Sequence, residues 1–201
     1  MLGAILLLGG CESTQRPGAP ADESTGPPPA VEASLRAAPF QSSAITLTGT
    51  VGQRTQAWTF QRFTADLHLK AGLPTGLEVV IDTASTAASD PALKARLGGD
   101  DLFAVAAHPQ ATFRASELRE LARAGDGRTY AATGVLTLAG RTHPATIPLE
   151  ISQSGKTTLV RLSAPIDAAA WQTAFRRSSE GVFDDRLQLQ ARLVFPATGS
   201  P

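Results

Sequence analysis

Apolar and polar residues alternate with a period of two along most of the chain from about residue 38. Such alternation is typical of half-buried antiparallel strands, whose successive side chains point to opposite faces. The expected strands are marked by these apolar positions and segments: Ile45 and Leu47; Phe63, Ala65, Leu67 and Leu69; Leu77, Val79 and Ile81; ATFRAS running on into SELREL; Tyr130, Ala132, Gly134, Leu136 and Leu138; Ile147, Leu149 and Ile151; TLVRLSAPI; and Leu187, Leu189, Ala191, Leu193 and Phe195.

Turn-forming residues separate these strands at short intervals. They occur in GLPTG at 72–76, AGDGR at 124–128, AGRTHP at 139–144 and QSGK at 153–156. Glycine, proline and aspartate in such clusters are typical of hairpin turns. The pattern therefore predicts an all-β, antiparallel barrel or sandwich of about eight strands.

One short helix is predicted in the middle of the chain, near residues 90–98. Ser89 or Asp90 can cap its start and Pro91 fits its first turn, while two glycines after Leu97 end it. A second, shorter helical piece is expected at AAAWQTAF, residues 168–175. SELREL at 116–121 could also form a helical turn, but we favour a strand there.

Composition describes a globular protein without a charge bias. Hydrophobic residues make up 42 % of the chain, and its 18 basic and 18 acidic residues give zero net charge. A domain of this size and composition can bury a core. Because nucleic-acid binding usually requires a basic excess or patch, we expect no nucleic-acid partner.

The first eleven residues, MLGAILLLGGC, resemble a bacterial lipoprotein signal peptide. The apolar run is too short to span a membrane as a helix but matches the apolar region of a signal peptide. LLGGC resembles a lipobox, although no Lys or Arg precedes it. The resemblance implies that Cys11 is acylated and anchors the protein to a membrane. Glu12, in place of the aspartate that retains such proteins in the inner membrane, favours the periplasmic face of the outer membrane.

The remaining domain boundaries follow from composition. Residues 12–37 are rich in Pro, Gly, Ser and Thr and predict a flexible tether. Residues 38–196 form the expected β-domain, and residues 197–201 a frayed tail. Cys11 is the only cysteine, so an acylated protein has no thiol left for a disulfide, a nucleophile or a thiolate metal site.

Candidate catalytic and metal-binding motifs are weak. His68, His108 and His143 lie on different expected elements without the spacing of a metal site, so we predict no metal and no cofactor. The chain has no GxSxG and no P-loop. Asp82, beside Thr83 and Ser85, is more simply a cap for nearby backbone N–H groups. We therefore expect no enzyme activity.

Two blocks of the sequence resemble the YceI-like family. The first runs from Asp101, Leu102 and Phe103 through His108-Pro109 to ATF at 111–113 and Ser116. The second comprises Gly134, Leu136, Thr137, Leu138, Gly140, Thr142 and Pro144. Where the family often has an aromatic residue this chain has His108, and it lacks the Arg-x-x-Phe-Gly segment and the Lys after the first strand's glycine. The resemblance covers roughly residues 40–195.

This resemblance implies a lipocalin-like barrel that holds a polyisoprenoid chain. Small inward residues, Ala65, Ala111, Ala132 and Gly134, would leave space for it. The candidate pocket-lining residues are Ile45, Leu47, Phe60, Phe63, Leu67, Phe103, Phe113, Leu136, Leu138, Ile147 and Trp171, with Arg114 and Arg141 as headgroup candidates. Each aromatic residue could equally be ordinary core. Pro109 favours an extended His108, so His108-Pro109 reads as a link from helix to strand.

The expected function is to bind, sequester or transport a lipophilic isoprenoid-type molecule, such as a quinone or a polyprenyl phosphate, in the cell envelope. Two alternatives remain: a filled barrel acting as an envelope stress or protein-interaction module, and an enzyme acting on a lipid. Because family members are often dimeric, the resemblance also allows a homodimer.

Overall fold

The protein is an antiparallel β-structure, seen here in a computed structural model that describes residues 31–39, 42–51, 54–87, 104–167 and 186–196. One 3-10 turn, η1 (Thr83–Ser85), interrupts the strands. The strands are β1 (Glu32–Arg36), β2 (Ala44–Val51), β3 (Arg54–Phe60), β4 (Phe63–Lys70), β5 (Leu73–Asp82), β6 (Thr86–Ala87), β7 (Gln110–Ala124), β8 (Gly127–Leu138), β9 (Arg141–Ser154), β10 (Thr157–Asp167) and β11 (Arg186–Pro196). Among the described residues, no helix is long and apolar enough to cross a membrane.

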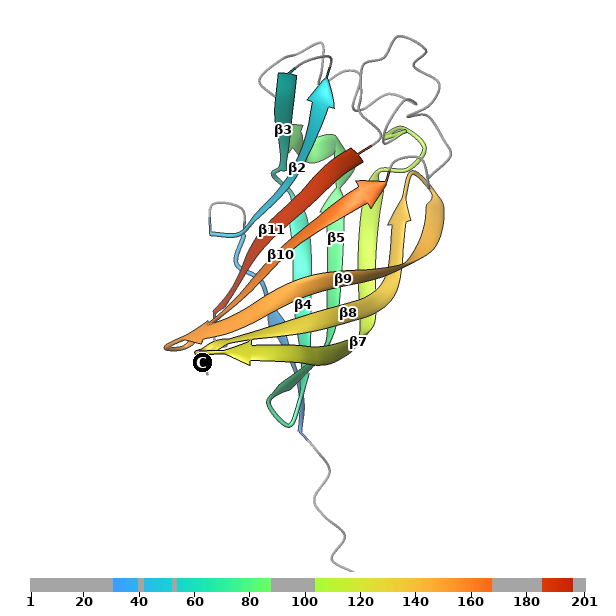
Figure 1. Cartoon of the computed structure of the whole chain (residues 1–201). Coiled ribbons are helices and arrows are strands. Elements are labelled where there is room, and N and C mark those ends of the chain that lie inside the picture. Colours follow the sequence, from blue (N-terminus) through green and yellow to red (C-terminus); the bar gives the residue numbers. More distant parts are fainter. Residues whose placement is uncertain (1–30, 40–41, 52–53, 88–103, 168–185, 197–201) are drawn as a thin grey trace, which may run out of the picture.

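All strands belong to one strongly curled sheet, in the order β1-β4-β5-β7-β8-β9-β10-β11-β2-β3-β6 (Figure 1). The segment after β1 joins two distant parts of it. The Ala37 N–H donates to the Ala65 carbonyl of β4 at 2.8 Å, and the Ala38 N–H donates to the Val194 carbonyl of β11 at 2.6 Å. These bonds connect β4 to β11, where the curled sheet closes into a lipocalin-like barrel.

A second contact ties the corner between β3 and β4 to the end of β5. The two-residue strand β6 pairs with β3 through Thr59 and Phe60. The Arg62 guanidinium forms an ion pair with the Asp82 carboxylate at 2.7 Å. Backbone and side-chain bonds between Arg62 and Ser85 reinforce this corner.

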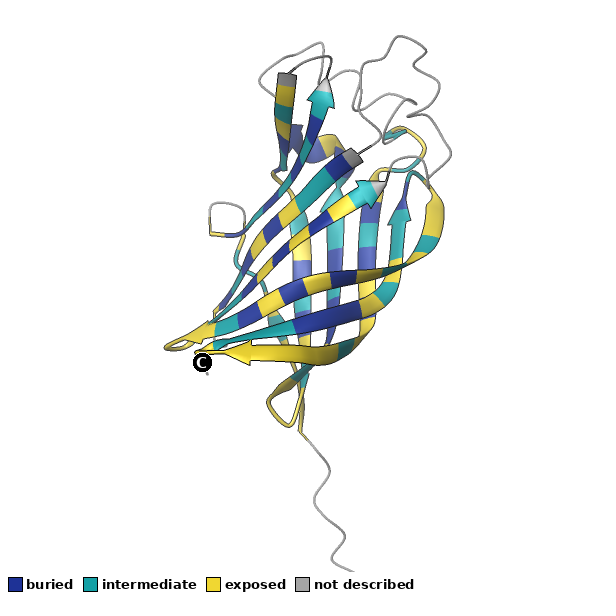
Figure 2. Cartoon of the chain, in the orientation of Figure 1, coloured by how far each residue is buried: buried dark blue, intermediate teal, exposed yellow. Residues whose placement is uncertain are grey.

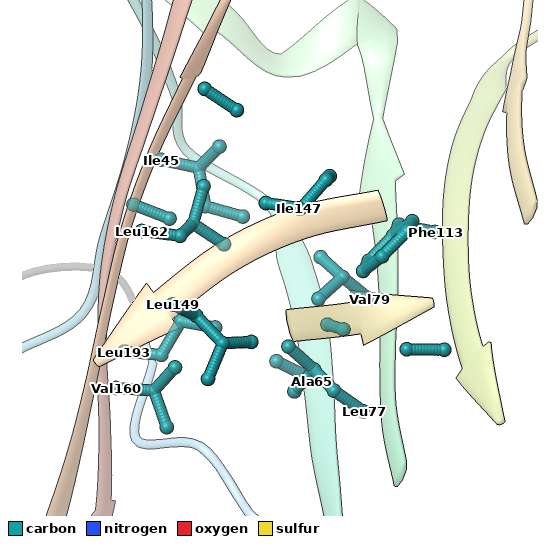
Figure 3. Close-up of a cluster of buried hydrophobic side chains, with 14 of the residues drawn as sticks. Ile45, Ala65, Leu77, Val79, Phe113, Ile147, Leu149, Val160, Leu162 and Leu193 are labelled. Atoms are coloured by element: carbon teal, nitrogen blue, oxygen red, sulfur yellow. The ribbon is translucent and has the colours of Figure 1, made fainter. Parts of the chain in front are cut away.

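The apolar faces of the strands meet inside the barrel. Figure 2 shows buried residues alternating with more exposed ones along most strands, as the period of two predicts, whereas the second half of β7 is exposed. Side chains from opposite walls contact one another in the core: Ile45, Leu162 and Leu193 approach from one wall, Val79 and Phe113 from the other (Figure 3). In the described residues the buried polar side chains are Ser43, Thr83, Ser85 and Thr86, and none of them is charged.

The prediction of an all-β antiparallel barrel is confirmed, but the strand count of about eight is wrong. The three added strands are β1, β3 and β6. Residues 32–36, assigned by composition to the tether, form β1 because Leu35 and its neighbours pair with β4. SELREL belongs to β7, as favoured. The helices predicted at 90–98 and 168–175 lie outside the described residues.

Candidate functional site

The interior of the barrel contains two small apolar cavities. Each has a volume of about 40 Å³. The first is lined by Ile45, Val79, Ile81, Ala111, Thr112, Phe113, Leu136, Ile147, Leu162, Leu189 and Ala191. The second is lined by Leu47, Phe60, Ile81, Ala111, Leu136, Leu138, Ile166, Leu187 and Leu189. Because Ile81, Ala111, Leu136 and Leu189 line both, the cavities are neighbours along one apolar core.

These volumes are far below that of an ordinary ligand pocket. Pockets for small molecules measure roughly 300–1,000 Å³. A cavity of about 40 Å³ has room for a few water molecules, but an apolar lining gives water too few polar partners to stay. The two cavities are therefore loosely packed places in the core. A larger ligand could bind there only by displacing the side chains around them.

Most of the predicted pocket residues face this interior. Seven of them line one or both cavities: Ile45, Leu47, Phe60, Phe113, Leu136, Leu138 and Ile147. Leu67 is buried in the same core, and Phe63 is half-buried against it. Phe103 and Trp171 lie outside the described residues.

Several cavity-lining residues were missing from the predicted set. They are Val79, Ile81, Leu162, Ile166, Leu187, Leu189 and Ala191, with the outward-facing Thr112 at the edge of one cavity. Most continue the same period-two alternation, so the strand pattern itself could have identified them. The predicted set of six aliphatic and five aromatic residues left them out, although aliphatic side chains make most of the wall. Ala111, predicted as a small inward residue, lines both cavities.

The small inward residues have two different roles. Ala65, Ala111 and Ala132 are buried, at 1 %, 6 % and 0 % exposure, and their size limits how far side chains fill the core. Gly134 does something else: a Cβ there would overlap the backbone of Arg114 and Ala115 on β7. This close approach falls beside a β-bulge between Ala115 and Glu117. Gly134 thus allows two strands to approach and does not leave space for a ligand.

The two headgroup candidates occupy different places. Arg114 projects from the outer face of β7, where its Nε lies 2.7 Å from the Glu78 carboxylate of β5, and 63 % of its side chain is exposed. Arg141 is exposed at the first position of β9, directly opposite Leu138. Arg141 lies on the same face of β9 as His143 and Ile147, the face directed to the interior. Because it is the first residue of the strand, it lies at the rim of the barrel.

The three histidines are separated on different elements. The His108 ring lies against Gly140 in the turn between β8 and β9. His68 is exposed on β4 beside Gly76, and His143 is half-buried on β9 opposite Leu136. Among the described residues, no group of three His, Cys, Asp or Glu side chains is placed to bind a metal ion.

Asp82, Thr83 and Ser85 form a structural turn. One Asp82 carboxylate oxygen accepts a hydrogen bond from the Ala84 N–H at 2.9 Å and so caps η1. The Ser85 hydroxyl donates to the Asp82 carbonyl at 2.6 Å and accepts from the Arg62 N–H at 3.0 Å. The predicted capping role of Asp82 is confirmed, and the hydroxyl that a hydrolase would use is engaged with backbone groups.

Taken together, the curled antiparallel sheet and its apolar interior define a lipocalin-like barrel. The chain belongs to the YceI-like family, because the YceI-like domain matches residues 36–195. A comparison with curated proteins found no match.

Solved structures share the fold at low sequence identity. BcnA of Burkholderia cenocepacia is 23 % identical, with a TM-score of 0.66 over 76 % of this chain and 95 % of BcnA. A polyisoprenoid binding domain from Saccharophagus degradans is 17 % identical, with a TM-score of 0.64 over 82 % of this chain and 97 % of that domain. The Campylobacter jejuni YCEI protein is 19 % identical, with a TM-score of 0.60 over 71 % of this chain and 85 % of the other.

Proposed function

We propose that the protein binds the chain of an isoprenoid-type lipid inside its barrel. The observation that supports this most directly is the pair of adjacent apolar cavities, which share Ile81, Ala111, Leu136 and Leu189. The Saccharophagus degradans relative, described as a polyisoprenoid binding domain, has the same fold and supports the same ligand class. Binding of this kind is sequestration without covalent chemistry.

A ligand must enlarge the interior as it enters. The two cavities, at about 40 Å³ each, hold only a fragment of an isoprenoid chain. Ile81, Leu136 and Leu189 line both cavities and are only partly buried, so movement of these side chains would join the two cavities. Each methylene of the lipid that leaves water contributes about 0.8 kcal/mol, which offsets the repacking.

The biological setting of this proposal is the bacterial cell envelope. An acylated Cys11 would hold the barrel at a membrane, and residues 12–30 would give it reach into the aqueous space. Several acyl chains anchor a protein stably, whereas a single chain does not. The ligand would then be a membrane isoprenoid, a quinone or a polyprenyl phosphate, which the barrel stores or transports.

Analysis of the lipid bound to the purified protein tests the ligand class. We expect mass spectrometry of an organic extract to find one isoprenoid lipid per chain. Ala111→Phe places a large ring between the two cavities and should abolish this recovery. Val135→Phe, on the exposed outer face of β8 next to Leu136, is the matched control and should retain the lipid. Equal lipid recovery from both variants, or none from the unmodified chain, contradicts the proposal.

The anchor is tested separately. Cys11→Ala should move the protein from the membrane fraction to the soluble fraction of its host without changing the lipid recovered from the barrel. Unchanged partitioning would remove the acylated anchor from the proposal and leave lipid binding in place.

The small cavity volumes favour one other function, a filled barrel that acts as an interaction module. The two functions differ in their response to an added lipid. A lipid-binding barrel should melt at a higher temperature when farnesol is added, because a ligand that binds only the folded state stabilises it. A filled barrel should melt at the same temperature with and without farnesol.

A further inference from the structure

The wall of the barrel divides between β9 and β10. These strands leave their shared hairpin together and then diverge (Figure 1). Their ladder runs from the Ser154–Thr157 pair to the Leu149–Leu162 pair, and in the described residues it continues no further. Beyond that point β9 pairs with β8 alone, as far as Arg141, and β10 pairs with β11 alone, as far as Asp167. We call these two facing strand segments, Arg141–Pro148 and Ser163–Asp167, the seam.

Three prolines explain why the ladder stops. If its register continued, Pro148 would face Ser163, Pro165 would face Thr146, and Pro144 would face Asp167. Along an antiparallel strand, successive residues direct their backbone N–H and C=O groups alternately to the neighbouring strand on one side and on the other. Since the β8–β9 ladder is unbroken, Pro144 and Pro148 direct their missing N–H groups toward β10. Pro165 lies four residues after Arg161 and so directs its backbone to the same side. Arg161 pairs with Glu150, which directs its backbone to the same side as Pro148. The position of the N–H that Pro165 lacks therefore faces β9 across the seam.

Prolines in this arrangement make both strands into edges. Proline cannot donate to a ladder and is found in sheets at edges and bulges. No ladder hydrogen bond between β9 and β10 has to break for the seam to open, because none is formed there among the described residues. The other place where neighbouring strands lack a ladder, between β4 and β11, is joined by the hydrogen bonds of Ala37 and Ala38.

An outer hollow of about 510 Å³ lies where the seam begins. Its lining comes from five strands: Ala44, Thr46, Thr129, Pro148, Leu149, Glu150, Arg161, Leu162, Ser163, Gln190, Ala191 and Arg192. Leu162 and Ala191 also line the first inner cavity. At Leu162 and Ala191, β10 and β11 therefore separate the hollow from the interior of the barrel.

Two arginines lie side by side in the hollow. Arg161 of β10 is directly opposite Arg192 of β11 in the ladder. Like charges at directly opposed positions destabilise a sheet, so this pair has a cost to the fold. The Arg192 Nη1 donates to the Ser42 carbonyl at 2.6 Å, which orients its guanidinium. Glu150 lies directly opposite Arg161 on β9 and lines the same hollow, but its carboxylate lies beside Gly127 on β8 and forms no ion pair with Arg161.

We propose that the seam is a lateral entrance through which the apolar tail of an isoprenoid lipid reaches the barrel, and that Arg161 and Arg192 bind the phosphate headgroup of that lipid in the outer hollow. This inference rests on the proposed lipid-binding function and adds the class of headgroup. Guanidinium groups match the geometry and charge of phosphate oxygens and bind them in preference to neutral groups. Bound phosphate also relieves the repulsion between the two arginines.

Three probes distinguish binding of the tail from binding of the headgroup, because one carries both groups and each of the others carries one of them. Calorimetry on the delipidated full chain compares farnesyl diphosphate, farnesol and inorganic diphosphate. We expect farnesyl diphosphate to bind most tightly, farnesol more weakly, and inorganic diphosphate weakest of all. If inorganic diphosphate binds as tightly as farnesyl diphosphate, the hollow is a site for free phosphate and the lipid entrance is refuted.

Arginine variants then locate the headgroup. Arg161→Gln should weaken farnesyl diphosphate by about tenfold, the usual value of one charged hydrogen bond, and leave farnesol unchanged. Arg192→Gln should do the same, with a small loss of stability from the Ser42 contact. Arg114→Gln, on the outer face of β7, is the matched control and should change neither affinity.

The outcomes distinguish failure of the headgroup site from failure of the proposed lipid-binding function. Unchanged farnesyl diphosphate affinity in Arg161→Gln and Arg192→Gln, with farnesol still bound, overturns the headgroup site alone. Binding of neither farnesol nor farnesyl diphosphate by the unmodified chain overturns the lipid-binding function and this inference together.

The entrance has its own test, a reversible cross-link across the seam. In a Cys11→Ser chain, Thr146→Cys and Pro165→Cys are joined by a cleavable bismaleimide, whose attachment mass spectrometry confirms. We expect farnesol uptake to slow at least tenfold and to recover on reduction. Thr133→Cys with Thr146→Cys, joined across an intact ladder on the same face, is the control and should leave uptake unchanged. Equal uptake with the seam closed overturns the lateral entrance.

Discussion

The His108 imidazole lies so close to Gly140 that a methyl group on Gly140 would overlap the ring. The contact joins the segment before β7 to the turn between β8 and β9. The His108 carbonyl accepts a hydrogen bond from the Thr83 hydroxyl at 3.3 Å, and the Pro109 carbonyl accepts one from the Thr83 N–H at 3.0 Å. His108 therefore connects three segments of the barrel end, a structural role for the most conspicuous histidine of the sequence.

Gly140→Ala should destabilise the protein more than an ordinary turn glycine does. Gly140 has a φ of +73°, and Gly125, at +56°, has open space around its Cα. Gly125→Ala should cost about 1 kcal/mol through backbone strain alone. Gly140→Ala should cost about 1–3 kcal/mol more because the new methyl meets His108. Urea unfolding measures both.

His108→Ala provides the second arm of this cycle. In its background the additional cost of Gly140→Ala should largely disappear, since the ring that the methyl meets is gone. Equal costs for Gly140→Ala in both backgrounds would show that the contact has no energetic consequence.

Ala71→Asn should stabilise the protein. Ala71 and Gly72 form the two-residue turn between β4 and β5, and both have positive φ, +51° and +76°. Such turns favour asparagine followed by glycine, whereas alanine is strained there. We expect a gain of about 0.5–1 kcal/mol in the free energy of unfolding. Ala106→Asn, at a turn residue whose own φ is not positive, is the control and should change stability little; a loss in Ala71→Asn contradicts the turn assignment.

Asp82→Ala and Asp82→Asn should differ. Alanine removes the acceptor for the Ala84 N–H and should cost about 1 kcal/mol, the usual effect of losing a cap. Asparagine keeps an acceptor oxygen and loses only the exposed ion pair with Arg62, a small effect. Thermal melts distinguish them. Equal losses in both variants would assign the stabilisation to the ion pair.

The period-two pattern predicted most of the barrel because one face of nearly every strand is buried. Ile45, Leu47 and Ile147 lie inside as their alternation requires. β1 and β6 escaped prediction for different reasons. The apolar side of β1 is mostly small, and its position depends on pairing with β4, a partner more than thirty residues away (Leu35 with Leu67). β6 has two residues, too few to show any period.

Bulges explain the ambiguity of SELREL. β7 contains register shifts between Ala115 and Glu117 and between Glu120 and Ala122. Each inserts a residue and reverses the parity of the strand. Leu118 pairs with Ala132 and packs against the core, whereas Leu121 is unpaired at the second shift and is 50 % exposed, so their helix-like spacing of three residues does not mark a shared buried face. Sequence parity alone could not place residues beyond a bulge.

The candidate site was predictable in its chemistry but not in its dimensions. Aliphatic inner residues follow from the alternation, whereas the cavity volumes depend on how side chains from opposite walls interlock. The outward direction of Arg114 follows only once the buried face of β7 is known. Pro144, Pro148 and Pro165 were a signal available in the sequence, because proline within a strand indicates an edge.

The hydrogen bond from Ala38 to Val194 also governs when the barrel can form. It joins residues from the two ends of the domain, so the wall cannot close until nearly the whole chain has been synthesised. Domains dominated by such distant pairings fold slowly, since the loop between the partners must be ordered first. A nascent chain therefore remains open until β11 emerges, and its apolar strands depend on that last segment for protection from aggregation.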